Sequence, residues 1–208
     1  MKIIFGFLLL AYLSSARICC AEKQDSLLSL FEKRVTTSPS DWETLNGYKT
    51  LCDSLKVLDR GIDFIKQLVE KKKNIPELHT ILGLFYIAKI EEVGDIEKGF
   101  LAGSALGEFN RALKVDSLSW SALYSRAMLY LNMPPEFAAY ELSLKDFHKL
   151  LYIQQEADIL ESHFVLTYIS LGDLYFKMKK KEKAIKTWKE GLEIFPDNDH
   201  LKNRISPK

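Results

Sequence analysis

The sequence predicts an all-α protein in the form of a solenoid, because one helical repeat recurs along the chain. A small residue recurs at one place in each repeat, and the four positions are Gly61, Ala105, Ser143 and Ala184. A mostly aromatic position recurs as well, at Cys52, Tyr86, Tyr130 and Tyr175. The repeats that start near Trp42 and Pro76 lie 34 residues apart. A fixed period of roughly 20 to 50 residues is typical of proteins whose repeats stack into a solenoid.

The first 21 residues differ from the rest and predict a secretory signal peptide. Lys2 is followed by the apolar run IIFGFLLLAYL and then by the small and polar residues SSARICCA. The run is too short to span a bilayer, which needs about 20 apolar residues. Cleavage after Ala21 fits best, with Ala16 as the alternative, and lipid attachment at Cys19 or Cys20 fits the motif poorly. We therefore expect export, with a bacterial periplasm or secretion favoured and the eukaryotic secretory route left open.

Removal of residues 1–21 changes the formal net charge from +1 to −1, because Lys2 and Arg17 leave and no acidic residue does. A nearly neutral domain has no electrostatic basis for binding nucleic acid or an anionic membrane. Cys52 is then the only cysteine, so the mature domain cannot form an internal disulfide. Its stability must come from its core.

A partial repeat comes first in the expected domain of residues 22–208, because Phe31 and Pro39 match only the end of a repeat. The first full repeat follows at residues 42–75. Its matching positions are Tyr48, Cys52, Gly61, Ile65 and Leu68. Lys49 occupies a position that is small in the other repeats, so this repeat is atypical, as terminal repeats usually are.

Three further repeats are expected at residues 76–119, 120–157 and 165–198. The second matches at Leu82, Gly83, Tyr86, Ala105, Phe109 and Ala112. The third matches at Arg126, Ala127, Tyr130, Ser143, Phe147 and Leu150. The fourth matches at Leu171, Gly172, Tyr175, Ala184, Trp188 and Gly191. The tail DHLKNRISPK predicts a short polar capping helix after the last repeat.

The fourth repeat, with Leu171-Gly172 before Tyr175 and Pro196 at its end, closely resembles the tetratricopeptide repeat. This family builds each repeat from two antiparallel helices, A and B. The resemblance covers most of residues 25–198. It implies a right-handed α-solenoid of about four helix pairs, with a partial N-terminal unit and a short C-terminal cap.

Three insertions depart from the length of the family's repeat. The second repeat is longer by about ten residues, in EEVGDIEKGFLAGSA, and the third by about four, in LNMPPEFAAYELS. About seven extra residues, in QQEADILES, precede the last repeat. We expect the first two to emerge as loops on one edge of the stack, where they could form a recognition surface.

No motif of an enzyme or a metal site is present. The four histidines, His79, His148, His163 and His200, are scattered without the spacing of metal ligands. The stretch GFLAGSALG lacks the Gly-Lys-Ser/Thr of a phosphate loop, and no nucleophile stands with a base. The lysine-rich KMKKKEKAIK is typical of a solvated turn, with docking of an acidic partner as the alternative. We therefore predict no catalytic residue, no cofactor and no metal.

The family resemblance implies a binding surface, because partners of these proteins generally bind the concave wall that the A helices line. Carried over, it gives seven apolar contact residues: Leu84, Ile87, Tyr124, Met128, Leu131, Ile169 and Phe176. An apolar groove has to be covered by something. A second copy, an amphipathic peptide or an apolar small ligand could cover it, as could insertion residues of the chain itself: Phe100, Leu101, Met133 and Phe137.

The sequence thus favours a non-enzymatic, exported scaffold or adaptor that binds another protein through the groove and the inserted loops. The alternative is a periplasmic subunit of a transport system that holds an apolar small ligand. That alternative rests on analogy with exported tetratricopeptide proteins of TRAP-type transporters. A protein or peptide partner is expected, nucleic acid is not, and a homo-oligomer is left open. No membrane span is expected once the signal peptide is removed.

Overall fold

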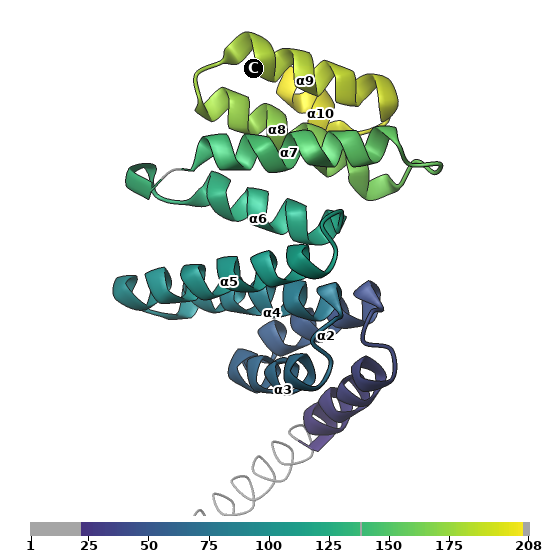
Figure 1. Ribbon diagram of the computed structural model, residues 1–208, viewed down its shortest axis with the longest axis vertical. Helices are drawn as coiled ribbons and strands as arrows, with labels where there is room; N and C mark the ends of the chain where they lie inside the picture. The colour runs from purple at the N-terminus through teal and green to yellow at the C-terminus, as the bar shows by residue number, and fades with distance from the viewer. Residues whose placement is uncertain (1–21, 138, 206–208) are drawn as a thin grey trace, which may run out of the picture. The chain divides into compact units, whose positions relative to one another are not determined.

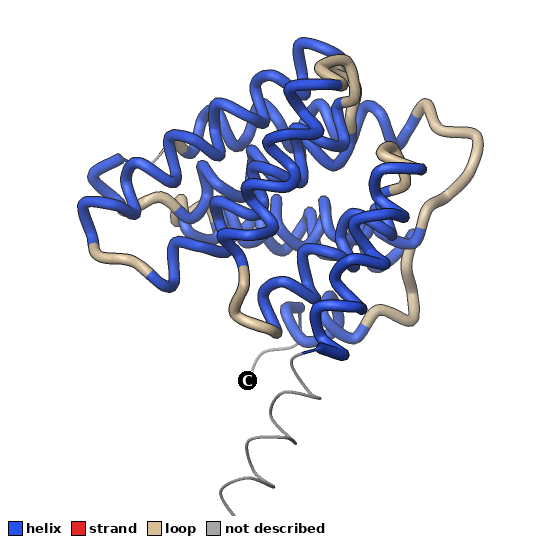
Figure 2. The backbone as a smooth tube through the Cα atoms, turned by 90° about the horizontal axis from the view of Figure 1, so that it is seen from below, coloured by secondary structure: helices blue, strands red, loops and turns tan. Residues whose placement is uncertain are grey.

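The computed structural model describes residues 22–137 and 139–205, and every regular element in them is a helix (Figures 1 and 2). The predicted signal peptide, residues 1–21, lies outside these residues. The chain forms two compact units, divided between Leu101 and Ala102. We call them the N-terminal unit and the C-terminal unit and describe each by itself.

The N-terminal unit contains a helix over residues 22–37, then α2 (Trp42–Ser54), α3 (Leu58–Lys71), α4 (Pro76–Lys89) and the 3-10 helix η1 (Ile90–Glu92). Its core draws on all four α-helices. The buried side chains include Leu28, Val35, Leu45, Tyr48, Cys52, Ile65, Ile81 and Phe85. Gly61 allows α3 and α4 to approach closely, because a Cβ atom there would lie 2.3 Å from the Phe85 ring.

Arg60 of α3 fixes the helix over residues 22–37 to the rest of the N-terminal unit. Its Nε donates to Glu32 Oε1 at 2.9 Å, and its Nη1 donates to Asp25. The Tyr48 hydroxyl donates to the same Glu32 oxygen at 3.1 Å. The partial N-terminal repeat is therefore held by polar contacts as well as by Leu28 and Val35.

α5 (Asp95–Val115) runs across the division between the two units. The first insertion is not the loop that we expected, because residues 95–104 form the opening turns of this 21-residue helix. Both Phe100 and Phe137, which could have covered a groove, are 72% exposed. Leu101 and Met133 are only partly buried. The two phenylalanines are therefore mostly open to solvent and do not act as a cover over the described residues.

The C-terminal unit continues with α6 (Trp120–Asn132), η2 (Pro135–Phe137), α7 (Tyr140–Gln155), η3 (Ser162–Phe164), α8 (Val165–Lys177), α9 (Lys181–Ile194) and α10 (Asp199–Ile205). One core cluster joins α6, α7 and α8. It includes Leu123, Ala127, Phe147, Leu150, Leu171 and Leu174. A second cluster joins α8, α9 and α10 through Tyr168, Ala184, Trp188 and Leu201.

Gly172 sets the close contact between α8 and α9, because a Cβ atom there would lie 2.1 Å from Trp188 Nε1. That indole nitrogen donates to the carbonyl oxygen of Ile169 at 3.2 Å. The A helices α2, α4, α6 and α8 begin at Trp42, Pro76, Trp120 and Val165, where the sequence places the starts of the four repeats. In the described ranges, no helix is long and apolar enough to cross a membrane.

Candidate partner-binding site

Two A helices of the C-terminal unit, α6 and α8, lie side by side and form the candidate surface. The Tyr124 hydroxyl and the Ser170 hydroxyl are hydrogen bonded at 3.0 Å. Lys177 Nζ donates to the carbonyl oxygen of Leu131 at 3.2 Å. These bonds join the two helices near their middle and at their C-terminal ends. We call the surface that carries Tyr124, Met128, Leu131, Ile169 and Phe176 the α6–α8 face.

The five predicted contact residues of the α6–α8 face differ widely in exposure. Leu131 is 3% exposed and Ile169 is 9% exposed, so both pack mainly inside the unit. Tyr124 and Met128 are half-buried against the core. Phe176 is 56% exposed, which makes it the apolar side chain of this set that is most available to a partner.

The other two predicted contact residues lie in the N-terminal unit. Leu84 and Ile87 share α4, and both are half-buried. Leu84 packs against the core of that unit. As partner contacts, all seven residues stay predictions.

Aromatic rings hold Tyr124 in place. Its ring stacks on Trp120 at a centroid distance of 4.8 Å and meets the edge of Phe147 at 6.2 Å. Burial raises the pKa of the Tyr124 hydroxyl, which therefore stays protonated and can donate to Ser170. Tyr124 thus supports the α6–α8 face structurally, and Phe176 and Leu166 supply its exposed apolar surface.

The sequence did not reveal the cluster around Trp120. The ring of His163, from the segment before α8, meets the Trp120 ring at 4.4 Å, and Phe164 lies at 6.4 Å. Trp120 Nε1 is buried and has no hydrogen-bond partner among the described residues. His163 lies in an insertion, outside the register of the repeat, so no sequence pattern pointed to this contact.

The capping helix α10 supplies a cation to Asp173, the acidic side chain of α8. Arg204 of α10 donates to both carboxylate oxygens of Asp173, at 2.6 and 2.7 Å. Such a two-pronged pair fixes orientation as well as charge. The α6–α8 face therefore has no unpaired carboxylate on α8.

In residues 22–137 and 139–205, no group of three or more His, Cys, Asp and Glu side chains could hold a metal ion. Cys52 is buried, and its burial raises the pKa of the thiol to about 11, so the nucleophilic thiolate is scarce at neutral pH. His79 is buried and packs with a ring nitrogen 3.0 Å from the carbonyl oxygen of Lys73.

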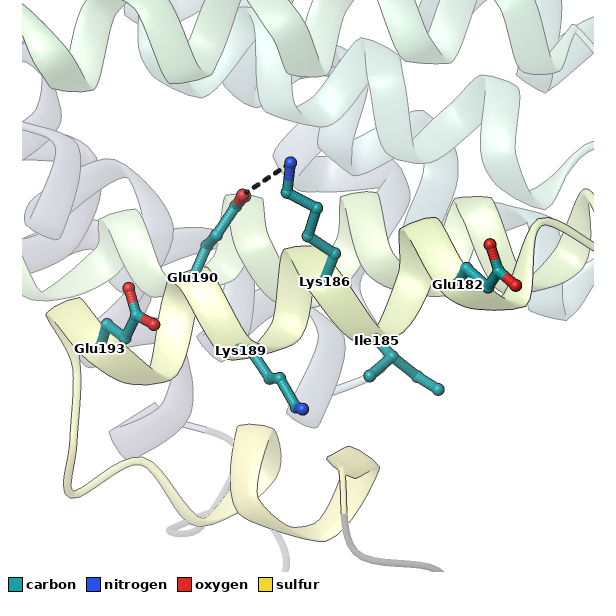
Figure 3. Close-up of a pocket in the computed structure, with 6 residues that line it drawn as sticks. All are labelled: Glu182, Ile185, Lys186, Lys189, Glu190 and Glu193. Atoms are coloured by element: carbon teal, nitrogen blue, oxygen red, sulfur yellow. Dashed lines mark ion pairs between the residues drawn. The ribbon is translucent and has the colours of Figure 1, made fainter.

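A shallow hollow on α9 is better explained as a solvated helix surface than as a ligand site. All its lining residues come from this one helix, and they are Glu182, Ile185, Lys186, Lys189, Glu190 and Glu193. Figure 3 shows both signs of charge along the helix and the ion pair between Lys186 and Glu190, whose atoms are 3.7 Å apart. The hollow is thus nearly neutral, and it overlaps only at its first three residues with the lysine-rich segment KMKKKEKAIK.

The comparisons with known proteins agree with this architecture. Residues 165–198 match the tetratricopeptide repeat family. No curated protein sequence matches the chain. A thermophilic tetratricopeptide protein of Thermus thermophilus is similar in structure over 91% of this chain and 92% of that one, with 17% identity and a TM-score of 0.67.

Two further solved structures are similar. A tetratricopeptide repeat protein of Parabacteroides merdae matches over 92% of this chain and 68% of that one, with 14% identity and a TM-score of 0.56. Human IFIT1, solved as a dimer with PPP-AAAA, matches over 83% of this chain and 39% of that one, with 17% identity and a TM-score of 0.65. At these identities the likeness shows the fold alone. The predicted fold class, an all-α tetratricopeptide solenoid, is confirmed, and within it residues 165–198 match the family's repeat.

Proposed function

We propose that the chain is a non-enzymatic, exported adaptor that binds another protein through the α6–α8 face and the connections beside it. The tetratricopeptide fold is a protein-binding fold, and this gives the class of the function. The observation that carries the specific surface is the exposure of Phe176 on α8. Met128 and Tyr124 are half-buried on the neighbouring helix α6. Exposed aromatic side chains beside half-buried apolar ones are typical anchors for a partner.

The spacing along α8 suggests what the partner presents. Leu166, Ile169 and Phe176 follow one another at intervals of three and seven residues, so they lie on one side of the helix. Leu166 and Phe176 are exposed at the two ends of this row. We expect the partner to contribute a peptide segment, helical or extended, with apolar side chains that contact this row.

Export is part of the same proposal and rests on the signal-peptide pattern of residues 1–21. It predicts that the protein from its natural host is found in the cell envelope or the medium and begins at residue 22. Fractionation followed by sequencing of the N-terminus checks this. An intracellular protein that retains Met1 would contradict it.

The alternative function, a transport-associated subunit that holds an apolar small ligand, has less support. The hollows described on this protein are lined mainly by charged and polar side chains. A small apolar ligand needs an enclosed and mostly apolar pocket. We therefore keep the adaptor as the conclusion.

The adaptor proposal can be tested with a matched pair of photo-crosslinking positions. A photo-reactive phenylalanine analogue replaces Phe176 on α8 or Tyr152 on α7, which are 56% and 58% exposed. The crosslinked protein is identified from the cell envelope and then purified. Its affinity is measured for the wild-type chain and for the Phe176→Asp and Tyr152→Asp variants.

We expect crosslinks from position 176 only, and a loss of about tenfold or more in affinity for Phe176→Asp, equivalent to about 1.4 kcal/mol. Tyr152→Asp should bind as the wild type does. Equal effects of the two substitutions, with both proteins still folded by circular dichroism, would exclude the α6–α8 face.

A further inference from the structure

A second hollow in the C-terminal unit lies between α5, α6 and α7 and has a different chemistry. Its volume is about 610 Å³. Its polar lining comes from three helices, and the residues used below are Asn110, Lys114, Arg126, Lys145, Asp146 and Lys149. Arg126 and Asp146 form a two-pronged ion pair, with Nε and Nη2 donating to the carboxylate at 2.8 and 2.7 Å. Arg126 Nη1 donates to Asn110 Oδ1 at 2.6 Å.

Arg126 keeps hydrogen-bonding capacity for a ligand. A guanidinium group carries five N–H donors, and Asp146 and Asn110 engage three of them. The other two have no partner in the part of the chain that the structure describes. The amide nitrogen of Asn110, whose oxygen already accepts a bond, adds donors of the same kind. The lining of this hollow thus offers donors, while the Asp146 oxygens are occupied by Arg126.

The charge of this hollow is also unbalanced. None of Lys114, Lys145 and Lys149 has a carboxylate at ion-pair distance within the described residues. With Arg126 paired to Asp146, the lining carries a net charge of +3. The hollow on α9 carries −1, and a third hollow, beside the helix over residues 22–37, carries +1. Of these three hollows, the one between α5, α6 and α7 therefore carries the largest positive charge.

Arg126 also breaks the packing pattern of the repeat. The corresponding A-helix positions are Tyr48 in α2, Leu82 in α4 and Leu171 in α8, and all three are buried. In α6 the same position carries a cation that lines an open hollow. Since helix residues are about 100° apart, Arg126 and Tyr124 point to different sides of α6. The hollow is therefore separate from the α6–α8 face.

We propose that the hollow between α5, α6 and α7 is an oxyanion site that binds neighbouring carboxylates of an acidic segment in a partner protein. The proposal rests on the proposed adaptor function in so far as the ligand belongs to a protein. Lys145 and Lys149 are one helical turn apart, about 5–6 Å at Cβ, which suits two carboxylates of one short segment. Arg126 and Lys114 contact the same segment from α6 and α5.

A labelled, blocked hexaglutamate peptide provides the probe, with hexaglutamine as the uncharged control. Binding to the purified chain is followed by fluorescence anisotropy at about 20 mM and about 200 mM salt, because added salt screens the attraction. The test variant is Lys145→Glu/Lys149→Glu on α7. The matched control is Lys186→Glu/Lys189→Glu on α9, which makes the same change of charge on the other B helix of the C-terminal unit.

We expect hexaglutamate to bind, hexaglutamine not to bind, and the α7 double variant to lose about tenfold or more in affinity, while the α9 variant loses less than about twofold. Lys114→Glu should weaken hexaglutamate binding as well. It replaces the α7 double variant as the test if that variant fails to fold. Equal losses from the α7 and α9 variants would overturn the site in favour of diffuse attraction. Tighter binding of inorganic phosphate or of a single-stranded oligonucleotide than of hexaglutamate would overturn the choice of ligand.

The two proposals fail in different ways. Phe176→Asp should leave hexaglutamate binding unchanged, because Phe176 does not line the hollow. A chain that binds hexaglutamate through Lys145 and Lys149 but shows no loss of partner affinity in Phe176→Asp retains the oxyanion site and loses the α6–α8 face. The reverse result retains the α6–α8 face and overturns the oxyanion site.

Discussion

The third and fourth helix pairs, α6–α7 and α8–α9, have the same packing positions, and one of these positions is charged in the third pair and apolar in the fourth. In α8 this position is Leu171, which is 2% exposed and belongs to the core. In α6 it is Arg126, which pairs with Asp146 of α7. The next residue is small in both helices, Gly172 and Ala127, so the helices still pack closely. In these two pairs the small residue is kept, whereas the position before it accepts either a leucine or an arginine.

The stability of the fold alone does not explain why the third helix pair carries the Arg126–Asp146 ion pair at this position. Asp146 is 3% exposed, so its carboxylate has been removed from water. Replacement of such a buried ion pair by apolar residues of similar size is often neutral or stabilising. A leucine works at the corresponding positions of α4 and α8. The pair therefore fits a role in binding, as the oxyanion site proposes, better than a role in holding the helices together.

The largest change in the free energy of unfolding is expected when Arg126 of α6 is replaced by leucine, the residue at the corresponding position of α8. Arg126→Leu leaves the Asp146 carboxylate buried and without its cation. Removal of one partner from a buried pair costs about 3–5 kcal/mol, and we expect the lower end because Arg126 is partly exposed. Urea unfolding followed by circular dichroism measures the loss.

The double variant Arg126→Leu/Asp146→Leu is the control that separates charge from packing. It should recover most of the loss and unfold within about 1 kcal/mol of the wild type. A double variant as unstable as Arg126→Leu would mean that the ion pair itself holds the third helix pair. The leucine found at this position in α8, Leu171, would then not be an adequate replacement for Arg126 in α6.

A smaller effect, on the pH dependence of the free energy of unfolding, is expected at the mostly aromatic position of the A helices. This position is Cys52 in α2 and Tyr175 in α8. Burial raises the pKa of the Cys52 thiol from 9.0 to about 11. The unfolded chain therefore releases this proton at lower pH than the folded chain does. The contribution of Cys52 is complete below about pH 9 and decreases as the pH rises toward about 11. At pH 10 the loss reaches about 1.4 kcal/mol.

The free energy of unfolding should thus fall between pH 8 and pH 10, with part of the fall due to Cys52. Cys52→Ala removes that part and should show a shallower pH dependence, even though it is less stable at pH 8. Tyr48 contributes in the same direction, because burial raises its pKa too. Parallel pH profiles for the wild type and Cys52→Ala would contradict the buried, protonated thiol.

The sequence predicted the helix pairs well because their packing depends on residue size at a few fixed spacings. Gly61, Ser143 and Ala184 lie in the first turns of α3, α7 and α9, as the sequence predicted. Ala105 lies in the B helix α5 as well, but ten residues after its start. The sequence did not predict that the first insertion would be helical. Residues 95–104 extend α5 although they include two glycines and make few core contacts. Local propensity there is weak, so no pattern of size distinguishes a helix from a loop.

The binding surfaces were less visible in the sequence. The family register placed Leu131 and Ile169 with Phe176, but exposure depends on neighbouring helices, and only Phe176 of these three is exposed. Arg126 was noted as the residue before Ala127, yet its partner Asp146 lies 20 residues later on another helix. A pair of that kind follows from the packing of α6 on α7 and has no short-range signal.

The smallest effect concerns the turns that the first and fourth helix pairs share and the third pair lacks. Lys56 and Lys179 follow α2 and α8 with φ angles of 58° and 60°, in the left-handed region that favours glycine. Val57 N–H donates to Cys52 O, and Lys180 N–H donates to Tyr175 O, both at 2.9 Å, which closes each helix end in the same way. Lys179→Gly should therefore stabilise the protein by about 0.5–1 kcal/mol. Lys56→Gly should gain less, because it also loses the ion pair with Asp53 at 3.4 Å.

Lys180→Gly is the matched control, because the φ angle of Lys180 is −91° and a glycine there adds only chain entropy to the unfolded state. Thermal unfolding should rank the variants as Lys179→Gly above Lys56→Gly, the wild type next, and Lys180→Gly last. If Lys179→Gly and Lys180→Gly shift the midpoint equally, the left-handed turn carries no strain. The tight turns of the first and fourth pairs would then differ from the inserted connection of the third pair in length alone.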